Sequence, residues 1–95
     1  MTQQKSAEPA RTKTWTLRLD IFEEDEDVTS VRAALDTGDN TLVTHATAHR
    51  NPHDRPVPEI GDEYAAGRAL LELGRQLVRA GTADAAANQP PSVSP

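Results

Sequence analysis

The residues of this sequence that could do chemistry are its histidines, its carboxylates and its hydroxyl side chains. His45 and His49 lie four residues apart, and His53 follows four residues later. If 41–49 is a strand, His45 and His49 share a face but stand about 13 Å apart, too far to bind one metal ion directly. His49 and His53 could approach each other across Pro52, but no carboxylate is placed beside them. We therefore expect no metal site.

Carboxylates are concentrated in the run 23–27, which reads EEDED. A calcium loop needs spaced oxygen ligands and a glycine for its sharp turn, and this run has neither. The Ser, Thr, Asp and His residues form no recognisable nucleophile or acid–base arrangement. We expect a protein that is not an enzyme and has no cofactor, and in which this run is a solvated hairpin loop.

The composition narrows the class of protein. The chain has 95 residues, a net charge of −5 and no cysteine. This length suits one small domain, and the lack of cysteine excludes disulfides, zinc–thiolate sites and cysteine nucleophiles. No apolar run approaches the length of a membrane span, and the N-terminus has no signal-peptide core. We therefore expect a cytoplasmic protein that does not associate with membranes.

Both ends of the sequence lack the pattern of a folded segment. Residues 1–11 are polar, and residues 82–95 are rich in Ala, Pro and Ser without apolar periodicity. We predict disordered tails there, with a single domain over 12–81. A domain of that size has a marginal core, and a partner often completes such a core. Self-association is therefore one expectation.

Period-two alternation predicts three strands, over 13–22, 28–37 and 41–49. In the first strand the apolar residues share one face, which is typical of a half-buried strand: Trp15, Leu17, Leu19 and Ile21. The sequence GDN at 38–40 favours a tight turn between the second and third strands. The strands should therefore form an antiparallel meander.

The register of the second hairpin depends on which two residues form its loop. With Gly38 and Asp39 in the loop, Leu35 faces Leu42, and the polar face pairs Arg32 with His45. Moving the loop by one residue keeps the same faces inward. The sequence leaves these two registers open.

From residue 58 the apolar period becomes helical. The predicted sheet-facing stripe contains Ala66, Leu70, Leu73 and Leu77, widened by Leu71 and Val78. Gly81 is the predicted stop, with arginines in the preceding turns. The predicted fold is therefore α+β: a three-stranded antiparallel meander with one long C-terminal helix packed on one face, in the order β-β-β-α.

Two glycines inside this helix are unusual. Gly67 and Gly74 lie seven residues apart, so they share nearly one face. Each costs roughly 1 kcal/mol of helix propensity. They mark a close approach of the helix to the sheet or to a partner, or they are tolerated surface glycines.

The stretch NPHDRPVPEI, residues 51–60, connects the last strand to the helix. Asn51 and Pro52 end the strand, because proline cannot donate to the ladder, and Pro58 suits the first helical turn. Val57 or Ile60 could anchor the junction on the core. The acids of the first turns face the positive end of the helix dipole: Glu59, Asp62 and Glu63. We interpret the stretch as a structural hinge; the alternative is a ligand-facing rim made by His53, Asp54 and Arg55.

The segment NPHDRPVPEIGDEYAAGRAL and the opening KTWTLRLDI resemble a small actinobacterial family of hypothetical proteins with a fold like the double-stranded-RNA-binding domain. The resemblance covers 12–81, and its most specific part is the junction: Asn51, Pro52, Asp54, Val57, Pro58, Glu59, Ile60, Gly61, Asp62 and Glu63. It implies a β3-α core and no assigned activity. The loop 23–27 departs from the pattern, because it lacks the glycine such loops often carry.

The fold resemblance raises RNA binding as an alternative function. In double-stranded-RNA-binding domains, the loop between the first two strands and the helix start contact the duplex. Here both regions are acidic, at 23–27 and at Glu59, Asp62 and Glu63, and would repel phosphate. Nucleic acid is therefore an unlikely partner, and a fold alone does not assign function.

The remaining function class is a protein-interaction or self-association module. The helix covers only one face of the predicted sheet, and an open face or edge invites pairing. The predicted interaction surface on the open face comprises Arg18, Arg32, His45, Thr47 and His49. With Asp20 and Asp36 it could make a homodimer or bind an unidentified protein. The alternative is a monomer whose charges solvate this face.

Overall fold

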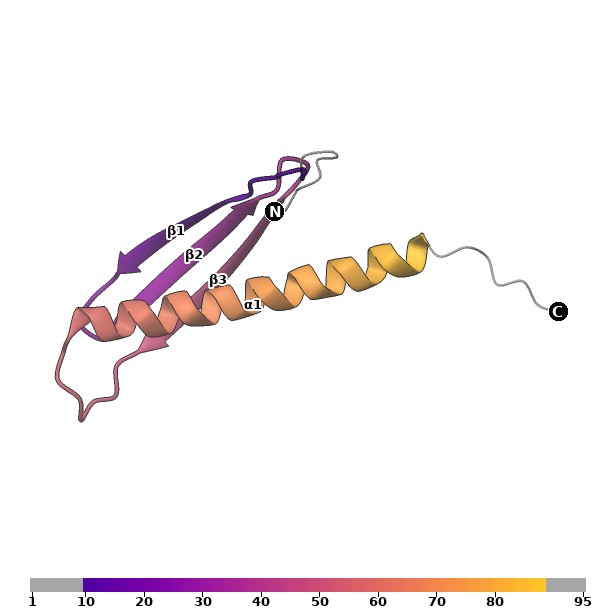
Figure 1. Cartoon of the computed structure of the whole chain (residues 1–95). Helices are drawn as coiled ribbons and strands as arrows, with labels where there is room; N and C mark the ends of the chain where they lie inside the picture. The colour runs from indigo at the N-terminus through magenta and orange to yellow at the C-terminus, as the bar shows by residue number, and fades with distance from the viewer. Residues whose placement is uncertain (1–9, 89–95) are drawn as a thin grey trace, which may run out of the picture.

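The computed structural model describes residues 10–88 and consists of three strands followed by one long helix (Figure 1). The elements are β1 (Thr16–Glu23), β2 (Val28–Asp36), β3 (Thr41–His49) and α1 (Pro58–Ala87). The sheet order is β1-β2-β3, and both strand pairs are antiparallel. The predicted α+β meander with a C-terminal helix is confirmed.

The hairpin between β2 and β3 adopts one of the two registers that the sequence left open. Leu35 pairs with Leu42, and Arg32 pairs with His45, as expected with Gly38 and Asp39 at the turn. Gly38 has φ of 90°, a conformation that residues with a Cβ rarely adopt. Its N–H donates to Asp36 Oδ1 at 2.8 Å, which fixes the turn.

The loop between β1 and β2 turns without a glycine. Asp25 Oδ1 accepts hydrogen bonds from the backbone N–H of Asp27 at 2.7 Å and of Val28 at 3.0 Å. Aspartate side chains form such turns by bonding to the backbone two or three residues onward. An aspartate thus takes the role that the family resemblance assigned to glycine.

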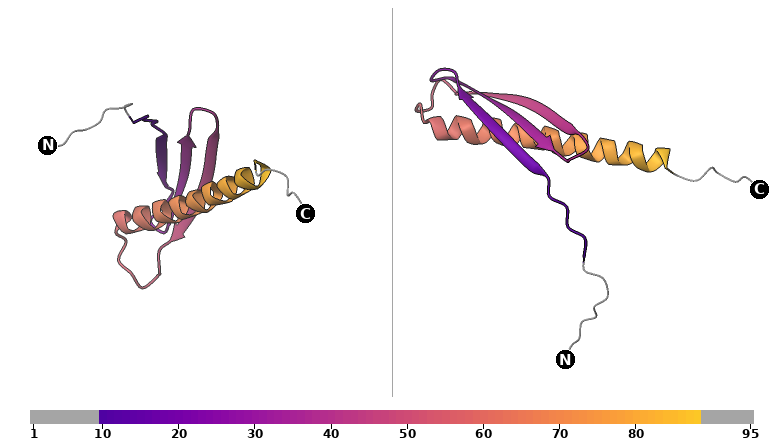
Figure 2. Two further views of the ribbon diagram at one scale, coloured as in Figure 1. Left: turned by 45° about the vertical axis from the view of Figure 1, so that its right-hand side comes forward. Right: turned by 90° about the horizontal axis from the view of Figure 1, so that it is seen from above.

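The core lies between α1 and the sheet and is built mostly from small side chains. Its buried apolar members are Val31, Ala33, Leu35, Ala48, Ala65, Ala69 and Leu73. Thr44 is also buried, and its hydroxyl donates to the Ala69 carbonyl at 2.9 Å. Alanines on the helix allow its axis to come close to the sheet. The helix crosses the strands obliquely (Figure 2) and packs mainly on β2 and β3.

The predicted sheet-facing stripe of the helix is partly wrong. Leu73 is buried, but Leu70, Leu71 and Val78 are 38%, 62% and 69% exposed. The sheet contact is made by Ala65 and Ala69 together with Leu73. The helix therefore has two apolar faces, and the bulkier one does not touch the sheet.

The predicted helix stop at Gly81 is also wrong. The helix continues to Ala87, through a run of alanines that favour it, and Asn88 Nδ2 donates to the Asp84 carbonyl at 2.9 Å. Residues 82–87, predicted as tail, are helical, whereas 1–9 and 89–95 of the predicted tails lie outside the described residues. A helix of 30 residues is about 45 Å long, against about 30 Å for a nine-residue strand. Its last turns extend past the sheet (Figure 1).

Candidate interaction surfaces

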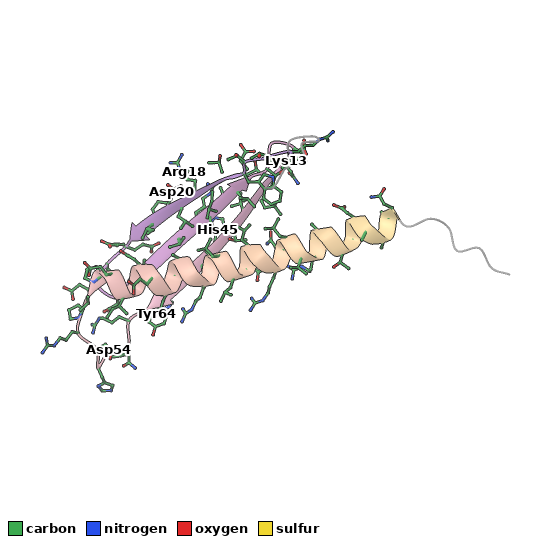
Figure 3. The ribbon with its side chains drawn as sticks, in the orientation of Figure 1. Lys13, Arg18, Asp20, His45, Asp54 and Tyr64 are labelled. Carbon is green, nitrogen blue, oxygen red and sulfur yellow. The ribbon has the colours of Figure 1, made fainter. Side chains whose placement is uncertain are left out.

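The open face of the sheet gathers the residues predicted to form an interaction surface. Arg32 on β2 pairs with Asp20 on β1 and with His45 on β3, so the three cross the middle of the sheet. Arg18 Nε lies 3.0 Å from Asp20 Oδ1, and the two are side by side on β1 (Figure 3). The remaining predicted members lie farther along β3 on the same face: Thr47 and His49.

This open face also holds a residue that the sequence reasoning missed. Phe22 pairs with Ser30, and half of its surface is exposed. It continues the period-two pattern of β1, and that alternation was the signal available for finding it. The face is therefore polar at its centre and apolar at the end of β1.

Arg50 organises the junction between β3 and α1, and it too was missed. Its guanidinium pairs with Asp27, with Nη2–Oδ1 at 2.7 Å, and its backbone N–H donates to the Asp27 carbonyl at 2.7 Å. It also donates to the backbone carbonyls of Asn51 and Asp54. Arg50 thus ties the acidic loop to the junction. The only sequence signal was a cation directly after a predicted strand, because the acidic run is more than 20 residues away in the chain.

Asn51 and Asp54 form the turn of the junction that follows β3. Asn51 Oδ1 accepts from the His53 N–H at 3.0 Å, and the Asn51 carbonyl accepts from the Asp54 N–H at 2.8 Å. Pro52 lies inside this turn, and Pro58 begins the helix. Asp54 lies at the tip of the junction (Figure 3).

Loop and junction together enclose a cavity of about 300 Å³. Val57 and Ile60, expected as core anchors, are 41% and 47% exposed and line this cavity instead, so that expectation was wrong. Of the alternative ligand-facing rim, Asp54 and Arg55 are among the lining residues. The wall is apolar on the helix side and charged on the loop side, with Glu23, Asp27, Arg50 and Tyr64 among its other residues.

Gly61 and Asp62 bring the helix start against the ends of the strands. A Cβ at Gly61 would lie 2.7 Å from Thr29 Oγ1, so this position needs glycine for close approach. Asp62 Oδ1 is buried and has no hydrogen-bond partner among residues 10–88. The neighbouring Asp62 carboxylate raises the pKa of the Glu23 carboxyl, and the charge of Glu59 acts in the same direction.

The helix-side face of β1 is largely uncovered. Trp15, Leu17 and Ile21 are 49%, 43% and 44% exposed, because α1 lies over the other two strands. In the predicted half-buried strand, only Leu19 packs partly against the core. β1 pairs with β2 alone, so its second edge is unpaired in the described part of the chain.

A third uncovered surface lies on the side of α1 away from the sheet. Tyr64, Leu71 and Val78 are 61%, 62% and 69% exposed there. A Cβ added at Gly67 or Gly74 would have no atom within 4 Å. These glycines therefore do not serve an approach of the helix to the sheet.

Within 10–88, no group of three or more His, Asp or Glu side chains is placed to hold a metal ion. No helix in the same part of the chain is both long and apolar enough to cross a membrane.

Comparison with known proteins gives relatives of unknown function. An uncharacterized protein of Mycobacterium bovis, Mb1767, is 41% identical over 70 residues, which cover 74% of this chain and 73% of the relative. The uncharacterized protein Rv2632c of Mycobacterium tuberculosis is 36% identical over 78 residues, covering 79% and 84%.

The fold has a solved counterpart among these relatives. The crystal structure of Rv2632c superposes with a TM-score of 0.75 at 35% identity, covering 87% of this chain and all of the other. A family model described as Rv2632c-like matches residues 13–92. The expected resemblance to an actinobacterial family of hypothetical proteins is thereby confirmed, and this chain belongs to the Rv2632c-like family.

Proposed function

We propose that this protein is a non-enzymatic interaction module that binds a protein partner through the helix-side face of β1. The observation that carries the proposal is the exposure of Trp15, Leu17 and Ile21, at 49%, 43% and 44%. They are large apolar side chains in a chain with one Trp, one Tyr and one Phe. An apolar patch on an edge strand is a usual place for another chain to dock.

The geometry favours an extended segment as the occupant. The outer edge of β1 can accept a fourth strand, whose backbone would bond to it while side chains meet the apolar face. The exposed residues follow a spacing of two, so the partner should present apolar residues at alternate positions. The acidic loop follows β1 directly, and a basic residue at the matching end of the partner would complement it.

Other function classes have less support. The open-face surface at Arg18, Arg32, His45, Thr47 and His49 is a second candidate for docking, but Arg18 already has Asp20 as a partner. Exposed ion pairs of this kind contribute little. Binding of double-stranded RNA would require phosphate to approach the acidic loop and Glu59 in the first turn of α1.

Affinity capture with matched variants tests the proposal. We would capture partners from nuclease-treated native lysate with the wild type, with Leu17→Thr and with Arg18→Thr. Both substitutions keep a residue that suits strands, but only the first removes apolar surface from the helix-side face. We expect Leu17→Thr to lose a partner that Arg18→Thr retains.

The opposite pattern would contradict this assignment. Loss of the partner with Arg18→Thr alone would move the docking surface to the open face. A parallel capture without nuclease completes the test, and partners recovered only from the untreated lysate would favour the nucleic-acid alternative.

A further inference from the structure

The uncovered side of α1 carries a second apolar seam. Its positions follow the alternating spacing of four and three that is typical of helices that pair with helices: Ile60, Tyr64, Gly67, Leu71, Gly74, Val78 and Gly81. Beyond Ile60, a large side chain alternates with a glycine along the whole seam. The sheet uses the other side of the helix, through Ala65, Ala69 and Leu73.

The glycines leave open space along this seam. A Cβ at Gly67, Gly74 or Gly81 would meet nothing within 4 Å. A shallow, open depression surrounds Gly74, lined by Leu70, Leu71, Gly74, Arg75, Val78 and Arg79. The large residues between the glycines are more than 60% exposed: Tyr64, Leu71 and Val78. The seam thus offers knobs and holes at one period.

We propose that α1 pairs with α1 of a second copy of this chain, antiparallel, about a two-fold axis between Glu72 and Leu73. In this register Leu71 faces the partner's Gly74, and Tyr64 faces the partner's Gly81. Val78 faces the partner's Gly67, and Ile60 faces the partner's Ala85. Every large residue meets a small one, and the two-fold symmetry makes the surface self-complementary.

Other arrangements of the same two helices fit less well. A parallel pair would set large residues against large ones and glycines against glycines, which leaves voids that lose contact energy. A shift of one heptad in one direction opposes Val78 and Ile60. The opposite shift leaves Gly67 facing a partner alanine. The antiparallel register about Glu72 and Leu73 avoids all of these mismatches.

The flanks of the seam set the salt dependence of the pair. On one flank Leu70 faces the partner's Leu77, which extends the apolar contact. On the other, Arg68 faces the partner's Arg75. Each arginine already has a partner in its own chain, since Arg68 donates to the Thr47 carbonyl at 3.0 Å and Arg75 to Glu72 at 3.3 Å. Salt screens the remaining repulsion, so the dimer should tighten as ionic strength rises.

The size of the contact indicates a modest dimer. A strip from Ile60 to Ala85 is about 39 Å long and about 10 Å wide, or roughly 800 Å² for both copies, which lies in the range of weak, reversible interfaces below roughly 1,200 Å². Residues 78–87 are all exposed and extend past the sheet (Figure 1). In the pair, residues 78–87 would pack against the first half of the partner's α1, so the part of the helix that extends past the sheet would also be buried.

Sedimentation equilibrium across a range of concentrations tests this pairing with two matched variants. Gly74→Gln fills the central hole of the seam, whereas Ala83→Gln adds the same side chain on the opposite side of the overhang. Glutamine favours helices over glycine, so Gly74→Gln should remain folded by circular dichroism. We expect it to weaken the dimer by on the order of tenfold or more and Ala83→Gln to leave it unchanged.

A distance measurement tests the register. The chain has no cysteine, so Ala83→Cys can carry a single spin label in each copy. The proposed axis separates the two labels by about 32 Å along the helices, and each heptad of shift changes this by about 10 Å. Labels at one level along the helices, as in a parallel pair, would overturn the proposal, and so would a wild type that stays monomeric at every concentration.

This inference goes beyond the proposed function, and the two can fail separately. Leu17→Thr should abolish partner capture but leave the dimer intact. Gly74→Gln should lose the dimer but still capture the partner. A dimer lost with Leu17→Thr and retained with Gly74→Gln would place self-association on β1 and contradict the seam.

Discussion

At the scale of single residues, Gly61 is a position where one methyl group changes the packing. Its Cβ would meet the Thr29 hydroxyl at 2.7 Å, whereas a Cβ at Gly67 meets nothing within 4 Å. We expect Gly61→Ala to lower the free energy of unfolding by about 1–3 kcal/mol, the usual cost of overpacking. Gly67→Ala should raise it by up to about 1 kcal/mol through helix propensity. Urea denaturation at low protein concentration measures the free energy of unfolding of both variants. The same change for both would show that Thr29 moves aside easily for a Cβ at position 61.

Glu23 and Glu72 are expected to affect stability with opposite signs. The neighbouring Asp62 carboxylate raises the pKa of Glu23 above the usual 4.5. Because its pKa is higher in the folded state than in the unfolded state, Glu23 contributes to the stability of the fold below pH 4.5. This contribution is lost as the pH rises through the folded pKa. Glu23→Gln should therefore raise the melting temperature at pH 7, and the two melting curves should converge in acid.

Glu72 is the matched control for this effect. Hydrogen bonds from Arg79 and Arg75 lower its pKa below the usual 4.5. Its contribution is present above pH 4.5 and is lost as the pH falls through the folded value. Glu72→Gln should lower the melting temperature at pH 7 and have no effect in strong acid. The same sign for both variants at pH 7 would contradict the pairing of these carboxyls.

At the scale of elements, Arg50 connects the acidic loop to the junction. Its side chain is 24% exposed and pairs with Asp27, whereas the Arg18 side chain is 75% exposed in its pair with Asp20. We expect Arg50→Ala to cost about 1–2 kcal/mol of stability and Arg18→Ala less than about 0.5 kcal/mol. Hydrogen exchange should accelerate in residues 24–27 only for Arg50→Ala. Unchanged exchange in that loop would show that Arg50 is not its anchor.

The strands were predictable from the sequence because apolar and polar residues alternate in each of them. The turn at Gly38 then determines how β2 pairs with β3. Gly38 provides the left-handed residue of that turn, and the register of β2 and β3 follows from it. The apolar periodicity predicted the helix but not which of its faces contacts the sheet. The large apolar side chains of Leu70, Leu71 and Val78 were predicted to face the sheet. In the structure two alanines, Ala65 and Ala69, are buried against it.

The candidate surfaces were predictable only where they depend on alternation. That is why Arg18, Arg32 and His45 were expected on one face and lie there. The alternative rim anticipated only Asp54 and Arg55 of the cavity at the junction. The rest of the cavity could not be predicted, because it depends on Arg50 bonding to a loop more than 20 residues earlier in the chain. The uncovered face of β1 depends on where the helix crosses the sheet, which no local pattern encodes.

At the scale of the whole molecule, the two proposals place different occupants on different surfaces. A dimer through α1 would leave β1 exposed in each copy, because the seam and the β1 face lie on different elements. Such a dimer would present two docking strands, and a partner with two matching segments would bind more tightly through effective concentration. Wild-type protein should therefore retain a bivalent partner longer than Gly74→Gln does, as measured by dissociation from an immobilised partner. Equal dissociation rates would show that the two strands act independently.

Assembly also makes stability depend on concentration. A partner subunit that binds only the folded chain raises the melting temperature by mass action. We expect the melting temperature of the wild type to rise with protein concentration and that of Gly74→Gln to remain constant. A constant melting temperature for the wild type would argue against a dimer in the tested range.

The most direct test of the central claim is the exchange footprint of the captured partner on this protein. Hydrogen–deuterium exchange, compared between the unbound and the bound protein, reports which backbone amides the partner protects. Docking on β1 predicts protection within Thr16–Glu23 and little change within Thr41–His49. Protection confined to Thr41–His49, or none on β1, would contradict the assignment of β1 as the docking strand.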